Sequence, residues 1–162
     1  MLSIIKLPNT KLRERSKEVE SEFLLSQEVQ KLIQEMIPVM YAADGVGLAA
    51  PQIGQNIRIC IISKAAIPSK HSLPQADLVL VNPVWVKSGL RKIEDWEGCL
   101  SVPKKIGKVK RYKHIKVQAF DAKGNLLSFS ASDLFARVVQ HEADHLDGVL
   151  FIDKAKEVQE VE

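Results

Sequence analysis

The sequence predicts an α+β fold in which mostly antiparallel, short β-strands pack around a helix near the C-terminal end of the chain. Three observations support this prediction: an N-terminal amphipathic helix pattern, several short runs of branched residues after it, and a second helical segment at the end. That order favours an antiparallel sheet over the alternating strands and helices of a parallel one. The length of 162 residues suits one domain, which we expect to span residues 1–162.

The first amphipathic helix is expected over residues 26–42. Its apolar residues recur at steps of three and four, which is the spacing of one helix face. They are Val29, Leu32, Ile33, Met36, Ile37 and Met40. Proline lacks the N–H of the helical hydrogen bond, so Pro38 is expected to kink the helix or to end it late. A glycine-bearing loop is expected next, over residues 44–55.

Short runs rich in branched residues predict strands after this loop, over residues 57–63 and 78–86. The polar stretch 68–74 between them is expected to be an exposed loop. Residues 90–96 are more mixed in composition and are also expected to form a strand.

Residues 108–121 show the two-residue alternation of a half-buried strand. Basic and polar side chains share one parity, and the apolar parity consists of Val109, Ile115, Val117 and Ala119. The turn signal over 121–125, which includes Gly124, predicts a hairpin into a further strand over 126–131.

The last helix is expected to begin after a capping serine, Ser130 or Ser132, and to end before Gly148. Its apolar face consists of Leu134, Phe135, Val138, Leu146 and Val149. Its opposite face is expected to be polar and carries Asp133, Arg137, Gln140, Asp144 and Asp147. His141, Glu142 and His145 fall within the apolar face, where polar groups are costly to bury unless a partner compensates them.

The sequence His141-Glu142-Ala143-Asp144-His145 is the strongest functional signal in the chain. Residues four apart leave a helix on the same side, so both imidazoles can bind one divalent ion. A glutamate next to the first histidine can reach a water on that ion and act as a general base. The pattern therefore predicts a catalytic metal site, and its alternative is two core histidines with a partly buried glutamate.

The third metal ligand distinguishes between classes of hydrolase. In one class of zinc protease it follows the second histidine at a position where this chain has Phe151, which cannot bind metal. The stretch after His145 is short and polar, so a downstream ligand on another helix is not expected. Cys99 is the best upstream candidate, because a thiolate with two imidazoles leaves one position open for water. The alternative role for Cys99 is that of a nucleophile with a histidine base.

The remaining cysteine and histidines have simpler interpretations. Cys60 lies in an apolar run and is expected to be a small buried side chain. His71 and His114 are expected to be ordinary surface histidines.

The glycine-bearing segment 45–52 has the outline of a dinucleotide-binding fingerprint, but it follows a predicted helix instead of a strand. Gly45 alone would serve as a helix C-cap. The second glycine, Gly47, and the alanines after it indicate a backbone that lies tightly against a ligand, with Gln52 offering a hydrogen bond.

Composition and charge exclude several other classes of protein. A net charge of +3 does not require a nucleic-acid partner, and no apolar run reaches the length that spans a membrane. Two cysteines are too few for a disulfide framework. Lys6 and Pro8 interrupt the N-terminal segment before a secretory signal could form, which favours a reducing, cytoplasmic location.

Three segments together resemble the three signature motifs of the peptide deformylase family. They are GVGLAAPQ at 45–52, EGCLS at 97–101 and QHEADH at 140–145, and they occur in the family's order. The resemblance covers nearly the whole chain. It implies a metal-dependent hydrolase that removes the formyl group from the N-terminal formylmethionine of newly made polypeptides.

The resemblance also implies roles for individual residues. Cys99, His141 and His145 would hold one divalent ion, Fe²⁺ in the cell, with Zn²⁺, Ni²⁺ or Co²⁺ as substitutes. Glu142 would be the catalytic acid and base. Gln52 and the backbone N–H of Leu100 would bind the developing oxyanion, and the backbone near Val46, Gly47 and Gly98 would align the peptide. Leu134 and Val138, which precede His141 on the same helix face, are expected to form an apolar wall for the methionine side chain.

This chain departs from the family pattern at two places. Ile106 stands where many members carry an arginine, which weakens peptide binding unless Lys104 and Lys105 substitute for it. The short acidic tail stands where bacterial relatives often have a basic helix that touches the ribosome. By resemblance, Arg111 is expected to pair with Glu97.

The expected partners are formyl-Met nascent peptides, with no membrane and no specific nucleic acid. The net charge of +3 is compatible with a transient ribosome contact, although the basic run 104–116 is better explained as a solvated strand face. The alternatives to a deformylase are a metallopeptidase built on the same helix motif and a non-catalytic metal-binding module.

Overall fold

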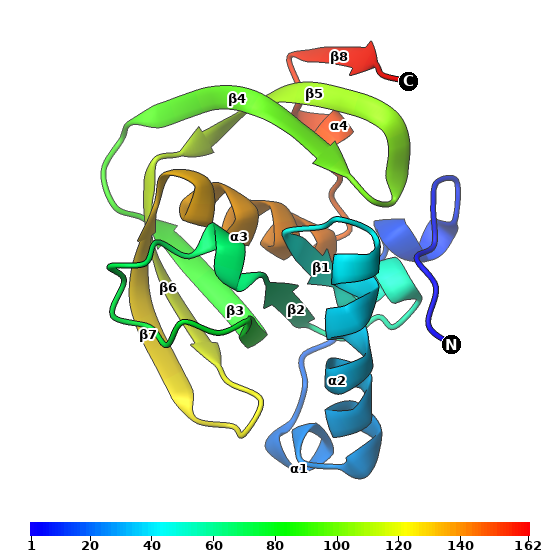
Figure 1. Cartoon of the computed structure of the whole chain (residues 1–162), viewed down its shortest axis with the longest axis vertical. Coiled ribbons are helices and arrows are strands. Elements are labelled where there is room, and N and C mark those ends of the chain that lie inside the picture. Colours follow the sequence, from blue (N-terminus) through cyan, green and yellow to red (C-terminus); the bar gives the residue numbers. More distant parts are fainter.

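Two antiparallel sheets enclose the helix that carries His141 and His145 (Figure 1). The structure is a computed structural model that describes all residues from 1 to 162. In the first sheet the strand order is β1 (Gly47–Ala49), β2 (Ile59–Ile62), β3 (Leu78–Lys87), β6 (His114–Phe120) and β7 (Leu126–Ser132). In the second it is β4 (Lys92–Cys99), β5 (Val102–Tyr112) and β8 (Glu157–Glu160). All strand pairings within the two sheets are antiparallel, which confirms the expected α+β class.

Helices cover the sheets and connect them. The α-helices are α1 (Ser21–Leu24), α2 (Gln27–Ala42), α3 (Asp133–Leu146) and α4 (Phe151–Lys154). The 3-10 helices are η1 (Thr10–Arg13), η2 (Ala50–Ile53) and η3 (Lys64–Ala66). The hydroxyl of Ser26 caps α2 by accepting a hydrogen bond from the Val29 N–H at 3.4 Å. The helix continues through Pro38 to Ala42, so Pro38 does not end it.

Helix α3 is buried on almost every side because it lies between the two sheets (Figure 1). Its apolar side joins the largest core cluster, with Phe135, Val139 and Leu146 packed against the five-stranded sheet. Cys60 belongs to the same cluster and is 1% exposed, which confirms its expected place in the core.

The opposite face of α3 is polar, as expected, but only its two ends, at Asp133 and Asp147, are exposed to solvent. Arg137, Gln140 and Asp144 are all buried. The Gln140 side chain accepts a hydrogen bond from the Tyr112 N–H at 3.0 Å and donates one to the Tyr112 carbonyl at 2.9 Å. This face therefore meets the end of β5, where its polar groups find partners inside the protein.

The single strand expected over residues 108–121 is wrong. The structure divides this stretch between β5 and β6, which belong to different sheets, with Lys113 between them. Val109 and Ile115 are both fully buried, so the same parity faces the interior before and after the crossing. The alternation is continuous in the sequence, and it therefore contains no sign of the change of sheet.

The loop expected over residues 44–55 is also more ordered than predicted. It contains β1, whose Leu48 pairs with Ile61 of β2, and the 3-10 helix η2. The second core cluster packs α2 against this region, and Leu48 is fully buried in it. The loop is thus held between α2 and the sheet, which fixes the position of Gln52 in η2.

Strand β8 covers the outer edge of β5, and all four of its side chains are exposed. Its Glu157 and Glu160 stand opposite Lys108 and Lys105. Within the basic run 104–116, these two lysines therefore lie beside carboxylates, and Arg111 is buried.

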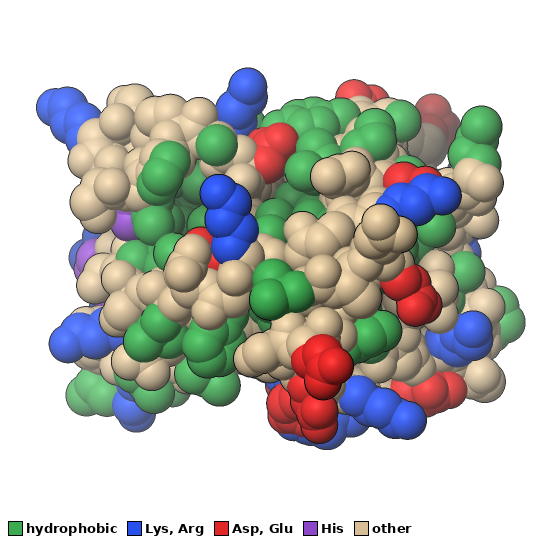
Figure 2. All heavy atoms as spheres, turned by 90° about the horizontal axis from the view of Figure 1, so that it is seen from below, with side chains coloured by type: hydrophobic (Ala, Val, Ile, Leu, Met, Phe, Trp, Pro, Cys, Tyr) green, Lys and Arg blue, Asp and Glu red, His purple; other side chains and the backbone are tan.

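Charges of opposite sign are mixed elsewhere on the surface as well. On the face seen in Figure 2, basic and acidic side chains are interspersed with apolar ones and form no field of a single sign. None of the helices has both the length and the apolar character needed to cross a bilayer.

Candidate metal centre and active site

His141 and His145 lie in the C-terminal half of α3 and leave it on the same side. The helix begins after Ser132, and the centroids of the two imidazole rings are 5.0 Å apart. The spacing of four residues thus brings the two rings together, as expected for neighbours on one helix face.

Cys99 reaches these histidines from the second sheet. It is the last residue of β4, which extends beyond the strand expected over 90–96. The pairing of β4 with β5 shifts register between Gly98 and Cys99, and such an irregularity redirects a side chain. Cys99 Sγ lies 3.2 Å from His145 Nε2. One ligand atom from each of Cys99, His141 and His145 lies within 4.8 Å of the other two.

Glu97 fixes the orientation of His141. Its Oε1 accepts a hydrogen bond from His141 Nδ1 at 2.8 Å, because a carboxylate can only accept here. The other ring nitrogen, Nε2, is left to face a metal, and a carboxylate behind a ligating histidine is the usual arrangement in such sites.

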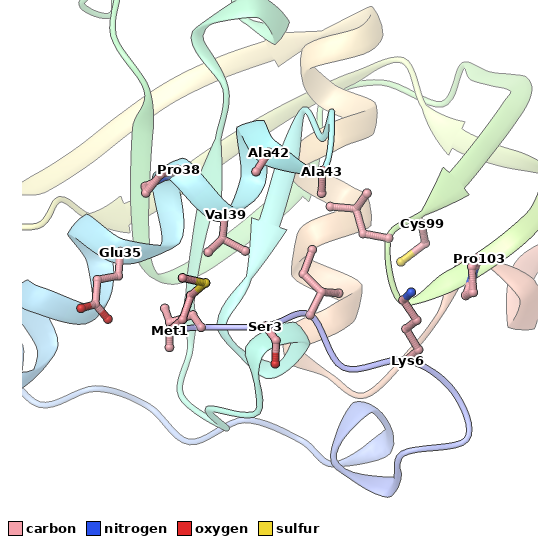
Figure 3. A pocket seen from close by; sticks show the side chains of 13 residues that line it. Met1, Ser3, Lys6, Glu35, Pro38, Val39, Ala42, Ala43, Cys99 and Pro103 are labelled. Atoms are coloured by element: carbon pink, nitrogen blue, oxygen red, sulfur yellow. The ribbon is translucent and has the colours of Figure 1, made fainter.

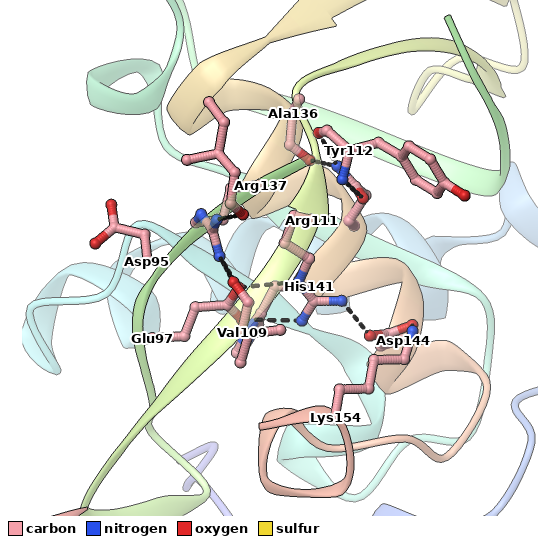
Figure 4. A network of polar contacts seen from close by, with 12 residues as sticks. Asp95, Glu97, Val109, Arg111, Tyr112, Ala136, Arg137, His141, Asp144 and Lys154 are labelled. Atoms are coloured by element: carbon pink, nitrogen blue, oxygen red, sulfur yellow. Dashed lines mark hydrogen bonds and ion pairs between the residues drawn. The ribbon is translucent and has the colours of Figure 1, made fainter. Parts of the chain in front are cut away.

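A buried network of ion pairs holds Glu97 in turn (Figure 4). Arg111 donates to both oxygens of Glu97 at 2.9 Å, which confirms the expected pair, and Arg137 donates to Oε2 at 2.6 Å. Arg111 also donates to Asp144 at 2.5 Å, and Lys154 reaches the same carboxylate at 3.0 Å. Although burial opposes ionisation, Arg111 and His141 hold the pKa of Glu97 well below its usual range.

The surroundings of the two histidines shift their pKa values in opposite directions. Burial lowers the pKa of His145 well below its usual value, which keeps this imidazole neutral, as a metal ligand must be. Burial also acts to lower the pKa of His141, but contacts with Cys99 and Glu97 outweigh it and raise this pKa to about 10. Binding an ion at Nε2 would displace that proton, so metal binding at this site releases protons.

Glu142 lies beside these groups and is almost completely buried. Burial raises its pKa to about 7, with the attraction of His141 acting in the other direction. Its Oε2 has no hydrogen-bond partner in the chain. A Cβ added at Gly47 would lie 2.8 Å from Glu142 Cδ and even closer to Oε1, so only glycine at position 47 leaves room for the carboxylate.

Gln52 presents its amide nitrogen to the same place. Its Oε1 accepts a hydrogen bond from the Ala49 N–H at 3.0 Å, which fixes the amide so that Nε2 faces the opposite direction. Nε2 lies 3.6 Å from Cys99 Sγ and 3.2 Å from Ser101 Oγ. The side chain is 1% exposed, so it is rigidly placed for a donor role.

The residues at this point fit a divalent transition-metal ion. One sulfur and two imidazole nitrogens are the donors that such ions prefer, and three protein ligands leave a position open for a water or a substrate. The unpartnered Oε2 of the buried Glu142 has the place and the chemistry of a group that hydrogen-bonds to that water. The arrangement can therefore activate water for hydrolysis.

A cavity of about 380 Å³ opens onto this cluster. Its walls include Leu100, the expected oxyanion donor, and all the residues expected to contact a peptide, namely Val46, Gly47, Gly98, Leu134 and Val138. Val46 and Leu134 are 45% and 55% exposed, so they form the rim. Val138 is only 5% exposed and is therefore buried. No atom of the chain requires glycine at position 98, because an added Cβ would come no closer than 3.7 Å to Ile106.

A larger cavity of about 780 Å³ lies between α2 and the N-terminal segment (Figure 3). Cys99 and Leu100 border it, but neither histidine nor Glu142 does. The smaller cavity is therefore the one in which a substrate would meet the candidate catalytic groups.

Sequence reasoning missed Arg137 and Trp96 as parts of this site, although both line the smaller cavity. Arg137 was expected only on the polar side of the helix, and nothing local distinguishes it from a solvated arginine. His71 and His114 do not join the cluster. His71 Nε2 instead bonds to the Ser130 carbonyl at 2.7 Å.

Comparisons with known proteins agree with this geometry. A family model described as polypeptide deformylase matches residues 1–161. Peptide deformylase 2 of Nostoc sp. is 40% identical over 96% of this chain and 87% of its own length. Peptide deformylase 1 of Clostridium acetobutylicum is 41% identical over 96% of this chain and 95% of its own length.

Solved structures are similar as well. The crystal structure of peptide deformylase from Thermotoga maritima has a TM-score of 0.84 and 33% identity, and the match covers 97% of this chain and 99% of that one. A Met-Ala-Ser bound structure of the class I type b enzyme from Acinetobacter baumannii has a TM-score of 0.85 and 32% identity, with 95% and 98% covered.

Proposed function

This chain belongs to the polypeptide deformylase family, and from that premise we propose which of its residues carry out the reaction. As a deformylase it removes the N-formyl group from the N-terminus of newly made polypeptides. We infer that residues 1–162 form a single catalytic domain, which is supported by the family match over residues 1–161.

We propose that Cys99, His141 and His145 bind one divalent ion per chain. The observation that carries this proposal is the convergence of one sulfur and two imidazole nitrogens within 4.8 Å. When bound, the ion supplies Lewis-acid activation of a water and of the formyl carbonyl. The resemblance of the three motifs favours Fe²⁺ in the cell. Zn²⁺, Ni²⁺ and Co²⁺ are substitutes, because a mixed sulfur and nitrogen set accepts several ions.

Glu142 is proposed as the acid and base of the reaction. Its carboxylate takes a proton from the attacking water and later delivers that proton to the amine that leaves as the new N-terminus. A pKa of about 7 suits both steps, because a proton carrier works best when its pKa is close to the operating pH.

Gln52 and Leu100 are proposed as donors to the oxygen that becomes negative when water adds to the formyl carbon. The amide nitrogen of Gln52 is held by its contacts with Ala49 and Ser101, so it does not need to reorganise during the reaction. Preorganised donors of this kind contribute about 10²–10³ each to the rate. The second donor is the backbone N–H of Leu100.

The peptide is proposed to lie along the rim of the smaller cavity, aligned by the backbone near Val46, Gly47 and Gly98. Leu134 and Val138 then form the wall that meets the methionine side chain. Both line the same cavity as His141 and Glu142, which supports this placement.

Formate release from formyl-Met-Ala tests the proposed function. Protein prepared without oxygen and loaded with Fe²⁺, and separately with Ni²⁺, is expected to release formate in both forms. Cleavage of an internal peptide bond without any formate would instead identify a metallopeptidase. That outcome is not expected, because Phe151 stands where a protease of this pattern would have its third ligand. Phe151 is buried, and its ring stacks on that of His141 with the two centroids 6.4 Å apart.

Gly47→Ala is expected to lower kcat for formyl-Met-Ala by about 10²-fold, which is the cost of a displacement of about 1 Å at a catalytic group. The added methyl group overlaps the Glu142 carboxylate and must displace it. Metal content is expected to change little, because the three proposed ligands are untouched. Unchanged kcat in a folded, metal-loaded variant would show that Glu142 does not need its present position.

The proposed partners are formyl-Met nascent peptides in the cytoplasm, where newly made chains begin. A transient ribosome contact is a further part of this proposal. The net charge of +3 permits such a contact, but no basic patch on β5 favours it, since Lys105 and Lys108 stand opposite glutamates of β8.

A further inference from the structure

The cavity proposed to receive the methionine side chain shares part of its lining with a second cavity. The second cavity has a volume of about 210 Å³ and is lined by residues of β4, of the end of β5 and of the first turns of α3. Leu134 and Arg137 line both cavities. Leu134 is largely exposed and stands at the rim, whereas Arg137 is buried, with only 9% of its surface exposed. Of the two residues that the cavities share, Arg137 is therefore the one shielded from solvent.

Three hydrogen bonds hold Arg137 in this position (Figure 4). It donates to Glu97 Oε2 at 2.6 Å, to the Val109 carbonyl at 3.0 Å and to the Ile93 carbonyl at 2.7 Å. These partners come from β4 and β5, so the guanidinium ties α3 to the second sheet. A buried guanidinium that loses such partners is costly, and the side chain cannot swing aside to admit a longer substrate.

The second cavity differs from the methionine cavity in the chemistry of its lining. Its lining includes the charged side chains of Asp95, Arg111, Lys113 and Asp133. The methionine cavity has an apolar wall in Leu134 and Val138. Arg137 lines both cavities and therefore lies at the boundary between this apolar wall and the charged lining of the second cavity.

We propose that Arg137 determines the length of the side chain that the enzyme accepts at the first residue of the peptide. Its guanidinium closes the inner end of the methionine cavity, so unbranched side chains of methionine length fit and longer ones do not. The proposal rests on the proposed function, because it assumes that the formylated residue occupies this cavity. Arg137 is a specificity-determining residue in this view, and it makes no contact with the reacting atoms.

A pair of substrates that differ in the length of the first side chain tests this proposal. The substrates are formyl-Met-Ala-Ser and its homologue in which 2-aminooctanoic acid, with two additional methylene groups relative to norleucine, replaces methionine. The native enzyme is expected to prefer the methionine peptide in kcat/KM by at least about 10-fold, since one methylene group in a closed pocket is worth about 10-fold or more. In Arg137→Ala this preference is expected to fall to about threefold or less.

Two further variants isolate the cause. Arg137→Met keeps a long side chain without the charge and is expected to keep most of the preference. Lys113→Ala removes a side chain that lines only the second cavity, and its preference is expected to equal that of the native enzyme. If Arg137→Ala does not fold, Arg137→Leu removes the guanidinium but retains apolar volume on α3, and an intermediate preference is expected.

Binding of the deformylated peptides to metal-free protein gives an independent measurement. The ratio of the two dissociation constants, measured by calorimetry, is expected to change between native protein and Arg137→Ala in the same direction as kcat/KM. An unchanged ratio, or an equal loss of activity on both substrates, would overturn the proposal. Failure of the native enzyme to release any formate would contradict the proposed function instead, while the binding ratio would still decide the role of Arg137.

Discussion

Glu142→Gln is expected to lower the rate of formate release from formyl-Met-Ala by about 10²–10⁴-fold, the usual contribution of a positioned acid or base. Glutamine has nearly the same shape as glutamate, so it fits beside Gly47 without displacing the backbone. It cannot take a proton from water at neutral pH, and it therefore removes the proton transfer without removing the side chain.

The metal content of Glu142→Gln is the control for this prediction. Glu142 is not among the three converging ligands, so the variant is expected to bind the same amount of Ni²⁺ as the native protein. Glu142→Ala is likewise expected to keep its Ni²⁺ and to release formate slowly. Turnover near the native rate in either variant would mean that another group carries the proton.

Cys99→Ala is expected to remove both the metal and the activity. Loss of an outer partner of a metal ligand already costs about 10–100-fold in affinity, and loss of a ligand itself is expected to cost more. Two imidazoles on one helix face remain, but the sulfur that approaches them from β4 is gone. Metal content after dialysis, measured by elemental analysis, and formate release are the two readouts.

Cys60→Ala is the matched control, because Cys60 is the other cysteine of the chain and lies in the core between α3 and the five-stranded sheet. It is expected to keep its metal and its activity. Retention of full metal content by Cys99→Ala would contradict the ligand assignment and would favour the earlier alternative, a cysteine nucleophile.

The histidine pair could be predicted from the sequence because its geometry is local. The distance between His141 and His145 depends only on the helix that contains them, and the periodicity of the surrounding residues predicts that helix. Cys99 was placed by its chemistry and by the family resemblance. Its approach depends on the irregular end of β4, which no local pattern specifies.

The buried polar network could not be predicted in the same way. Arg137 and Asp144 have the spacing of a solvent-facing side of the helix, and the sequence alone cannot show that a second sheet covers that side. Their burial depends on partners such as Glu97 and Arg111, which lie far away along the chain. The passage of the chain from the second sheet to the first at Lys113 could not be predicted for a related reason. Which sheet a strand joins depends on long-range packing, and not on the local alternation of residues.

Strand β8 has a consequence for how molecules of this protein meet one another. A strand at the margin of a sheet carries unpaired backbone N–H and carbonyl groups, which form a template for joining the sheet of a second molecule. By pairing with β5 over residues 105–108, β8 occupies those groups with a segment of the same chain. The exposed glutamates of β8 stand at the new margin, and like charges there disfavour the approach of an identical margin.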